Sequence, residues 1–446
     1  MKLVLALGLN AALMSVLLSW LRREWRGTGT AWRAALVVGL GARLLIGILR
    51  DAHPTGDAAY MQHLGQLLTA QLWADPAAGL RALAGNTVQF AGELAVYYGL
   101  SNTLFSGKVL AVVNLLSVGN PWLNALYLSL FSFVGCWQLA RTLARVLPAA
   151  PAGAGLVGLV MWPSVAYWAA GLSKEAVLLG SGAWLLALVL DRLYAPPAAT
   201  ARGPGMNLRW SLAATVLALL FFNMRYFLAV PLLGGLLALA LVQALRRRGW
   251  VHGRAAQVLV LAAVLAAGAG LAPEISGVFR PNKFTSQVLR IYTHDLAESA
   301  GRPHFEFADL RPTPTSLLAN APSAALNAFT RPWLGESSEP RYVAAGLENA
   351  LLLVLLVGAL VALARGRGGR MPFALAVVLA GYCLLLAVLM GLTTPNLGTL
   401  SRYRSLLLPF WVLLLLQNDY AAAALRRLGL GAPAGPAGAR PPRPMA

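Results

Sequence analysis

The sequence predicts an all-α, polytopic integral membrane protein with about eleven transmembrane helices. Of its 446 residues, 58% are hydrophobic and only 12% are charged. The mean hydropathy is +0.65, which lies outside the range of ordinary soluble domains. Apolar windows of up to about 20 residues, the length that crosses a bilayer, alternate with short polar breaks. These observations favour one polytopic domain over residues 1–428.

Each predicted span is an apolar window whose ends are set to within about two to four residues. The windows cover residues 3–20, 34–50, 122–141, 151–171, 176–191, 209–223, 226–245, 256–273, 345–364, 371–392 and 403–417. The tail at 429–446 is rich in Gly, Pro, Ala and Arg. Because such a composition cannot bury a core, the tail is predicted to be disordered and cytoplasmic.

The charge distribution predicts the orientation of the chain. The formal net charge is +20, from 36 Lys and Arg against 16 Asp and Glu. The arginines cluster in short loops between apolar windows, which is typical of positive-inside topology, and no nucleic-acid motif accompanies them. With eleven spans, the basic loops all fall on one side. We therefore expect an outer amino terminus, a cytoplasmic carboxyl terminus and no nucleic-acid partner.

Two long loops, 51–121 and 274–344, are predicted on the outer side, and loops of this length are usually functional. In the first, apolar residues at helical spacing between Asp57 and Trp73 predict an amphipathic helix on the membrane surface. Residues 104–118 are apolar but short, which favours a surface helix or a re-entrant segment. In the second loop, a helix is predicted at about 286–299.

Charged residues from five separate segments are predicted to meet at this outer face. They are Asp51 and Asp57; Lys174 and Glu175; Arg225; Arg331; and Arg402 and Arg404. Outer arginines run against the positive-inside trend, and pairing with an anion is the usual reason for such an exception. The set predicts a site for an anionic substrate at the ends of the spans.

This combination suits group transfer from a lipid phosphate. A carboxylate at the membrane face can accept the proton of an acceptor hydroxyl, which contributes roughly 10²- to 10⁴-fold in rate. Guanidinium groups can hold a phosphate leaving group and neutralise the charge that develops as the bond breaks. A dry groove between helices can hold the lipid tail.

Each of these residues also has a structural interpretation. Asp57 can cap the helix that begins beside it, and Asp51 can pair with Arg50 as an interfacial anchor. Lys174 and Glu175 can form an ion pair within a short loop. The outer arginines can extend to the lipid headgroups.

The cysteines and histidines give little support for a metal site. Cys136 and Cys383 lie within apolar windows and are expected to be small core residues. His53 and His63 have no partner at metal-ligand spacing, so a divalent cation such as Mg or Mn would depend on the aspartates alone. No metal ligand is assigned, and the cofactor requirement stays open.

The stretch Gly56-Asp57-Ala58-Ala59-Tyr60, at the start of the first outer loop, resembles the acidic site of the GT-C glycosyltransferase superfamily, which includes bacterial relatives of protein mannosyltransferases. The resemblance extends over roughly residues 34–417 in span order. It implies sugar transfer from a polyprenyl-phosphate donor to a glycan, lipid or protein acceptor, at the outer face of a bacterial inner membrane. It also implies Asp57 as the base, Asp51 as the second candidate, and Tyr60 among the substrate-binding residues.

Three further stretches are similar to segments of bacterial envelope-polysaccharide membrane proteins. They are Ser173-Lys174-Glu175 after Trp162-Pro163-Ser164, Thr330-Arg331-Pro332-Trp333, and the residues from Pro395 to Arg404. Two features depart from the GT-C pattern. An extra span precedes the usual first one, and two separated aspartates replace the common Asp-Glu pair.

Other functions stay open. An oligosaccharide polymerase or O-antigen ligase would share the topology, use a lipid-pyrophosphate donor and depend on outer arginines more than on an aspartate. A transporter or flippase for a lipid-linked or anionic solute would often contain internal repeats, and the sequence contains no convincing repeat. A non-catalytic scaffold is the remaining class.

Overall fold

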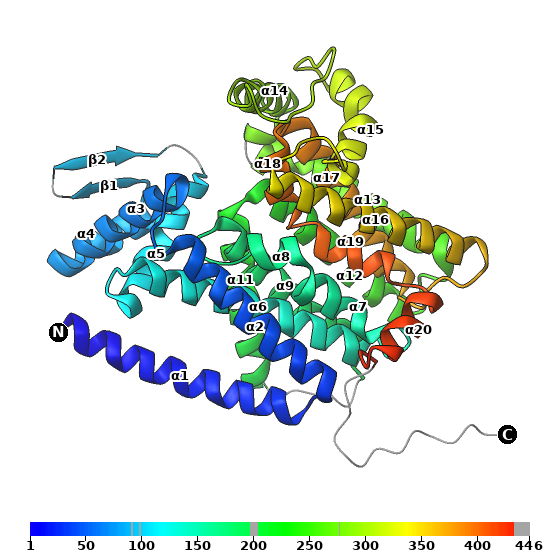
Figure 1. Cartoon of the computed structure of the whole chain (residues 1–446), viewed down its shortest axis with the longest axis horizontal. Helices are drawn as coiled ribbons and strands as arrows, with labels where there is room; N and C mark the ends of the chain where they lie inside the picture. The colour runs from blue at the N-terminus through cyan, green and yellow to red at the C-terminus, as the bar shows by residue number, and fades with distance from the viewer. Residues whose placement is uncertain (91, 98–99, 197–203, 276, 432–446) are drawn as a thin grey trace.

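The computed structural model describes residues 1–90, 92–97, 100–196, 204–275 and 277–431, which form a bundle of long helices (Figure 1). In this part of the chain, nine helices are long and apolar enough to cross a membrane. They are α1 (Lys2–Arg26), α2 (Thr30–Asp51), α6 (Pro121–Val146), α9 (Lys174–Tyr194), α11 (Pro204–Met224), α12 (Tyr226–Arg247), α13 (Gly253–Ile275), α16 (Pro340–Ala364) and α17 (Phe373–Thr393). The chain is therefore a multi-pass, all-α membrane protein, as its composition predicts.

The two remaining apolar windows are interrupted helices. The window at 151–171 becomes α7 (Ala152–Leu156), a π-helical turn η1 (Val157–Met161) and α8 (Pro163–Trp168). The window at 403–417 is divided between α18 (Leu397–Arg404) and α19 (Leu408–Leu415). Both α8 and α19 have a proline in their first turn, where the missing N–H prevents continuation of a preceding helix. Regular membrane-length helices are thus present for nine of the eleven windows in the described residues.

A buried arginine satisfies the backbone at the first interruption. Arg43, in α2, is 0% exposed, and its Nη2 donates to the carbonyl oxygen of Leu159 at 3.1 Å. In a regular α-helix this oxygen would accept from residue 163, but Pro163 has no N–H. Nη1 of Arg43 donates to Ser132 Oγ at 3.1 Å and to Cys136 Sγ at 3.4 Å. Arg43 therefore ties α2, α6 and η1 together.

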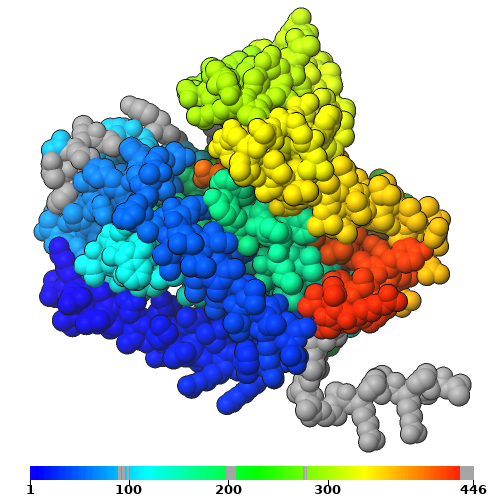
Figure 2. All heavy atoms as spheres, viewed as in Figure 1, coloured from blue at the N-terminus to red at the C-terminus, as the bar shows by residue number. Residues whose placement is uncertain are grey.

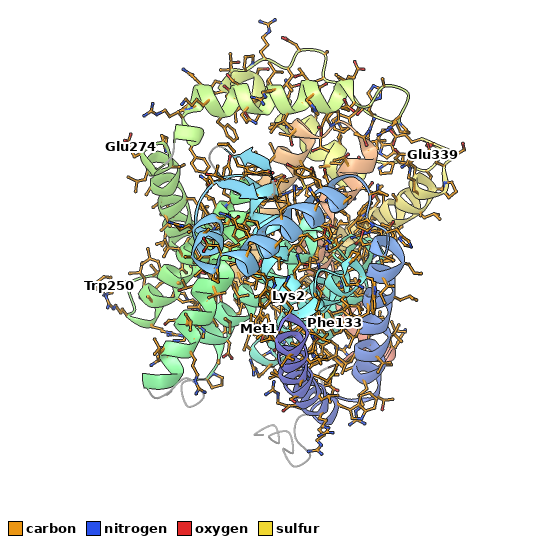
Figure 3. All side chains as sticks on the ribbon, turned by 90° about the vertical axis from the view of Figure 1, so that its left-hand side faces the viewer. Met1, Lys2, Phe133, Trp250, Glu274 and Glu339 are labelled. Atoms are coloured by element: carbon orange, nitrogen blue, oxygen red, sulfur yellow. The ribbon has the colours of Figure 1, made fainter. Side chains whose placement is uncertain are left out.

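The core of the bundle is the contact between α6 and α9, which run parallel. Phe133, near the centre of Figure 3, is fully buried on α6. Gly135 and Gly180 approach so closely that a Cβ on either one would collide with the opposite helix. Further along the pair, Arg145 Nη2 lies 3.0 Å from Asp191 Oδ1. Because α6 and α9 point the same way, residues 147–173 return along the length of the pair.

The second interrupted segment returns in a similar way along α17. An isolated β-bridge pairs Gly368 with Asn418, and the Asp419 N–H donates to the carbonyl oxygen of Arg367 at 3.2 Å. These contacts place the end of α19 beside the start of α17. The segment α18–α19 therefore runs back from the end of α17 to its beginning.

The two long loops lie at one end of the bundle, which we name the loop end (Figure 1). The first contains α3 (Gly56–Ala74), α4 (Pro76–Ala84), the antiparallel strands β1 (Thr87–Phe90) and β2 (Glu93–Val96), and α5 (Asn102–Ser117). The second contains a 3-10 turn η2 (Gly277–Phe279), α14 (Pro281–Ala297) and α15 (Pro314–Thr330). The helices predicted at 57–73, 104–118 and 286–299 correspond to α3, α5 and α14. The helices α4 and α15 and the β-hairpin were not expected.

The first and last described residues lie at opposite ends of the bundle (Figure 1). In Figure 3, Glu274 and Glu339, which border the second loop, lie at one level, above Trp250. The amino terminus is at the loop end, where Asn10 Nδ2 donates to the carbonyl oxygen of Leu116 at 2.9 Å, at the end of α5.

The last described helix, α20 (Asp419–Arg427), lies at the end opposite the loop end (Figure 1). Leu430 beyond it is buried, and Trp32 Nε1 donates to the carbonyl oxygen of Gly431 at 3.1 Å. The first residues of the tail predicted to be disordered, 429–431, therefore pack on the bundle. Residues 432–446 of that tail lie outside the described part.

Replacing Arg43 by methionine is expected to lower the free energy of unfolding by about 1–3 kcal/mol, because the carbonyl of Leu159 loses its donor. Adding Pro163→Ala supplies the N–H that a regular helix would offer there, and should restore part of the loss. Thermal unfolding of the purified protein in detergent measures both effects. Arg427→Met removes an exposed arginine and should change stability by less than about 0.5 kcal/mol. An equal loss in this control, or a double variant less stable than the single one, would contradict the role of Arg43.

Candidate functional site

Glu175 lies at the centre of a cluster of charged side chains at the loop end. It is 0% exposed and occupies the first turn of α9, where the partial positive charge of the helix terminus favours a carboxylate. The helix is capped by Ser173, whose Oγ accepts from the Ala176 N–H at 3.1 Å. A fully buried carboxylate requires charged or hydrogen-bonding partners, and its cationic partners come from other segments.

Two arginines pair with Glu175. Arg402 Nη2, on α18, donates to Oε2 at 2.9 Å, and Arg225 Nη2, at the junction of α11 and α12, donates to Oε1 at 3.4 Å. The Arg225 guanidinium also lies 4.2 Å from the centre of the Tyr403 ring, which is a cation–π contact. One buried carboxylate thus joins residues that are 50 and 227 positions away in the sequence.

Lys174 connects this cluster to the first long loop. Its Nζ donates to Asn102 Oδ1 and to Thr103 Oγ1, each at 3.0 Å, at the start of α5. Both acceptors are neutral, so they do not compensate the lysine charge. Asp57 lies close enough to interact electrostatically with both Lys174 and Arg402. Asp57 is exposed and interacts with this cluster, whereas Asp51 is buried and the exposed Asp75 caps α4.

The cluster carries more positive than negative charge and has access to the surface. Its cations are Lys174, Arg225 and Arg402, and its anions are Glu175 and Asp57. Arg225 Nε is buried without a hydrogen-bond partner, so one of its donors is unused. The Arg402 side chain is 25% exposed, and Figure 2 shows α18, in orange, at the floor of a notch between the two long loops. Such an arrangement can bind an anion.

Asp51 has a structural role at the end of α2. It is 5% exposed, and its Oδ2 accepts from the Leu172 N–H at 2.6 Å and from Arg50 Nη2 at 3.1 Å. Gly171 has φ +68, and a Cβ at this position would collide with the Asp51 carboxylate. Arg50 also donates to the carbonyl oxygens of Tyr167 and Ala170. These contacts match the interpretation of Asp51 as an anchor with Arg50, and leave Asp57 as the stronger candidate base.

Asp57 and Tyr60 lie on the first turns of α3. The N-cap of α3 is Thr55, so Asp57 is not the capping residue. The half-exposed Tyr60 places its hydroxyl 2.6 Å from the hydroxyl of Tyr97. Burial, and then the hydrogen bond to Tyr60, raises the pKa of Tyr97, so the Tyr97 hydroxyl stays protonated at neutral pH. The predicted substrate-binding residue Tyr60 thus belongs to the first loop and presents a polar edge beside Asp57.

Arg404 and Arg331 form a separate group. Arg404 is 2% exposed and donates to the carbonyl oxygens of Arg331, at 2.5 Å, and Phe329, at 3.4 Å, and to Asn349 Oδ1, at 2.6 Å. It thereby satisfies carbonyl groups at the end of α15. Arg331 itself pairs with Glu336 at 3.0 Å. The structure therefore places these two predicted residues outside the ion pairs of Glu175.

Glu348 is a polar residue that sequence reasoning missed. It lies in α16, and its Oε1 accepts from Ser164 Oγ at 2.5 Å and from Trp162 Nε1. Arg43 was missed for the same reason, since each is a single charge within or beside a strongly apolar window. The sequence indicated the stretch Trp162-Pro163-Ser164 but not its partner. In the structure, the Ser164 hydroxyl and the Trp162 indole both donate to Glu348.

The described residues do not assemble a metal site. No group of three His, Cys, Asp or Glu side chains gathers there at ligand distance. Asp51 is already engaged by Arg50 and a backbone N–H. Cys136 and Cys383 are buried free thiols, in agreement with their expected place in the core. No chemistry is therefore assigned to Mg or Mn.

Replacing Glu175 by glutamine is expected to lower the free energy of unfolding by about 3–5 kcal/mol, because Arg225 and Arg402 lose the only carboxylate that they contact among the described residues. Glu339→Gln is the matched control, since its pair with Arg341 is exposed and should contribute less than about 1 kcal/mol. Thermal unfolding in detergent compares the two variants. A control as unstable as the Glu175 variant would refute the special role of the buried pair.

Comparison of this chain with protein-family models, curated proteins and solved structures gave no match. The residues of the site are therefore the basis on which its function is inferred.

Proposed function

We propose that this chain is a membrane glycosyltransferase that moves a sugar from a polyprenyl-phosphate donor to an acceptor at the loop end. The observation that carries the proposal is the convergence of Lys174, Arg225 and Arg402 around buried Glu175, with exposed Asp57 within electrostatic reach. The GT-C-like stretch Gly56–Tyr60 supports the same assignment, because it contains this aspartate.

The cations would bind the donor phosphate. Arg225 and Arg402 each use one terminal nitrogen on Glu175, which holds their guanidinium groups in place and leaves further N–H donors for a phosphate. Lys174 adds a point charge from the start of α9. Donors that are fixed in advance stabilise the leaving phosphate without reorganisation during the reaction.

In the proposed reaction, Asp57 accepts the proton of an acceptor hydroxyl. The hydroxyl oxygen then forms a bond to the anomeric carbon of the sugar. The bond from that carbon to the phosphate oxygen breaks, and the polyprenyl phosphate leaves with the bonding electron pair. The cations compensate the negative charge that grows on the leaving phosphate.

The proposal includes eleven membrane crossings, nine by regular helices and two by the interrupted segments. The parallel course of α6 and α9 and the return of α18–α19 along α17 support both additional crossings. Basic residues such as Arg145, Arg247 and Arg426 then lie at the cytoplasmic face of a bacterial inner membrane, and the loop end faces outward. The amino terminus is outside and the carboxyl terminus is cytoplasmic.

A second candidate function is polymerisation or ligation of an oligosaccharide from a lipid-pyrophosphate donor. The observation that favours it is the surplus of positive charge, since three cations can serve two phosphates. In this case the outer-face cations would matter more than Asp57.

Replacing Asp57 by asparagine is expected to reduce transfer roughly 10²- to 10⁴-fold while binding of polyprenyl phosphate stays unchanged, because a general base acts in the chemical step. Lys174→Gln should instead weaken polyprenyl-phosphate binding by about tenfold, since a charge-assisted contact is lost without disturbing Glu175. Purified protein in detergent is assayed for binding of polyprenyl phosphate and for transfer from lipid-linked sugars with one or two phosphates.

Asp309→Asn is the control, because Asp309 lies in the second long loop and pairs with exposed Arg311. Full transfer activity in the Asp57 variant refutes its role as the base. The polymerase or ligase is supported if transfer occurs only from the pyrophosphate donor, is lost in the lysine and arginine variants, and is kept in the Asp57 variant.

A further inference from the structure

A groove of about 480 Å³ lies between α1 and α2, at the end of the bundle opposite the loop end. It is lined by Leu21, Arg22, Trp25, Arg26, Leu36, Val37, Leu40, Gly41 and Leu44. Only 11% of the apolar window of α1 is buried, and the two helices diverge from their junction (Figure 1). Because α1 packs little against the bundle, the groove is left between two apolar helix faces.

The basic end of the groove has no neutralising acid. Glu24, the acid nearest in sequence, is 7% exposed, accepts from Trp137 Nε1 at 3.1 Å and pairs with Arg141 at 3.1 Å. Arg22 and Arg26 are exposed and form no ion pair within the described residues. Two guanidinium groups without a carboxylate partner therefore lie at the basic end of an apolar groove.

The length of the groove matches one leaflet of a bilayer. From Leu36 to Leu44 the helix rises about 12 Å, at about 1.5 Å per residue. Half of a hydrocarbon core of about 30 Å is about 15 Å. Trp25 lies beside the arginines, where an aromatic side chain would meet the headgroup region.

We propose that this groove binds an anionic phospholipid, with one acyl chain along α2 and the phosphate against Arg22 and Arg26. The site is independent of the function proposed for the loop end, because it lies at the opposite end and shares no residue with it. The lipid would fill the space between α1 and the bundle and fix α1 in place.

The test measures how strongly a brominated lipid quenches the fluorescence of Trp25. The full chain is reconstituted in phosphatidylcholine vesicles that contain a minor fraction of either brominated phosphatidylglycerol or brominated phosphatidylcholine. The Trp25 signal is the fluorescence difference between the protein and its Trp25→Phe variant. We expect several-fold stronger quenching by the anionic lipid, since each arginine that meets an anionic headgroup raises binding by about fivefold.

Two double variants test the role of the arginines at the basic end of the groove. Arg22→Gln with Arg26→Gln should abolish the preference for the anionic lipid. Arg426→Gln with Arg427→Gln removes the same charge from α20, at the same end of the bundle, and should preserve it. Loss of the preference in both double variants would overturn the proposal in favour of diffuse surface charge.

Two glycine variants test whether a lipid chain occupies the apolar part of the groove. Gly41 lines the groove, and a Cβ there meets no heavy atom within 4 Å, so Gly41→Leu places a bulky side chain in the groove. Gly358→Leu, on α16, is equally open and serves as the matched control. We expect reduced quenching for Gly41→Leu only. Equal quenching by both lipids in the unmodified chain, or no quenching of Trp25 because a second copy covers α1, would refute the proposal.

Discussion

The structure depends on hydrogen-bond partners for the backbone N–H and C=O groups that are left free wherever an apolar helix is interrupted. In hydrocarbon, an N–H or C=O group without a partner costs several kcal/mol, so a broken helix needs side chains that reach its free groups. Arg43 does this for the carbonyl of Leu159, and Asp51 for the N–H of Leu172. Burying a charged residue in or beside an apolar window costs free energy. Here the buried charge provides the hydrogen bonds that allow the helix to be interrupted.

The same interruptions determine where the candidate site lies. Glu175 follows the turn after α8, Arg225 lies between α11 and α12, and Arg402 belongs to the short helix α18. At such breaks the side chains of several segments face one another instead of lipid. Burial makes the pairing of Glu175 obligatory, and the pairing in turn holds two guanidinium groups in fixed positions beside a surface notch.

The two proposed sites use arginine in contrasting ways. At the loop end, Arg225 and Arg402 are oriented by a buried carboxylate, which suits a reaction that requires fixed donors. At the α1–α2 groove, Arg22 and Arg26 are exposed and unpaired, which suits attraction of a mobile lipid headgroup. The distinction lies in burial, since all four side chains carry the same charge.

The sequence by itself determined the membrane class, the apolar windows, the two long loops and the segments from which Asp57, Lys174, Glu175, Arg225 and Arg402 come together. Hydropathy and helical periodicity are local properties, so they can be read along the chain. Only the tertiary structure decided that Glu175 is the centre of the cluster, that Arg404 satisfies carbonyl groups of α15, and that Arg43 completes η1. These roles depend on partners from 50 to 227 positions away, and an average over a local window cannot identify them.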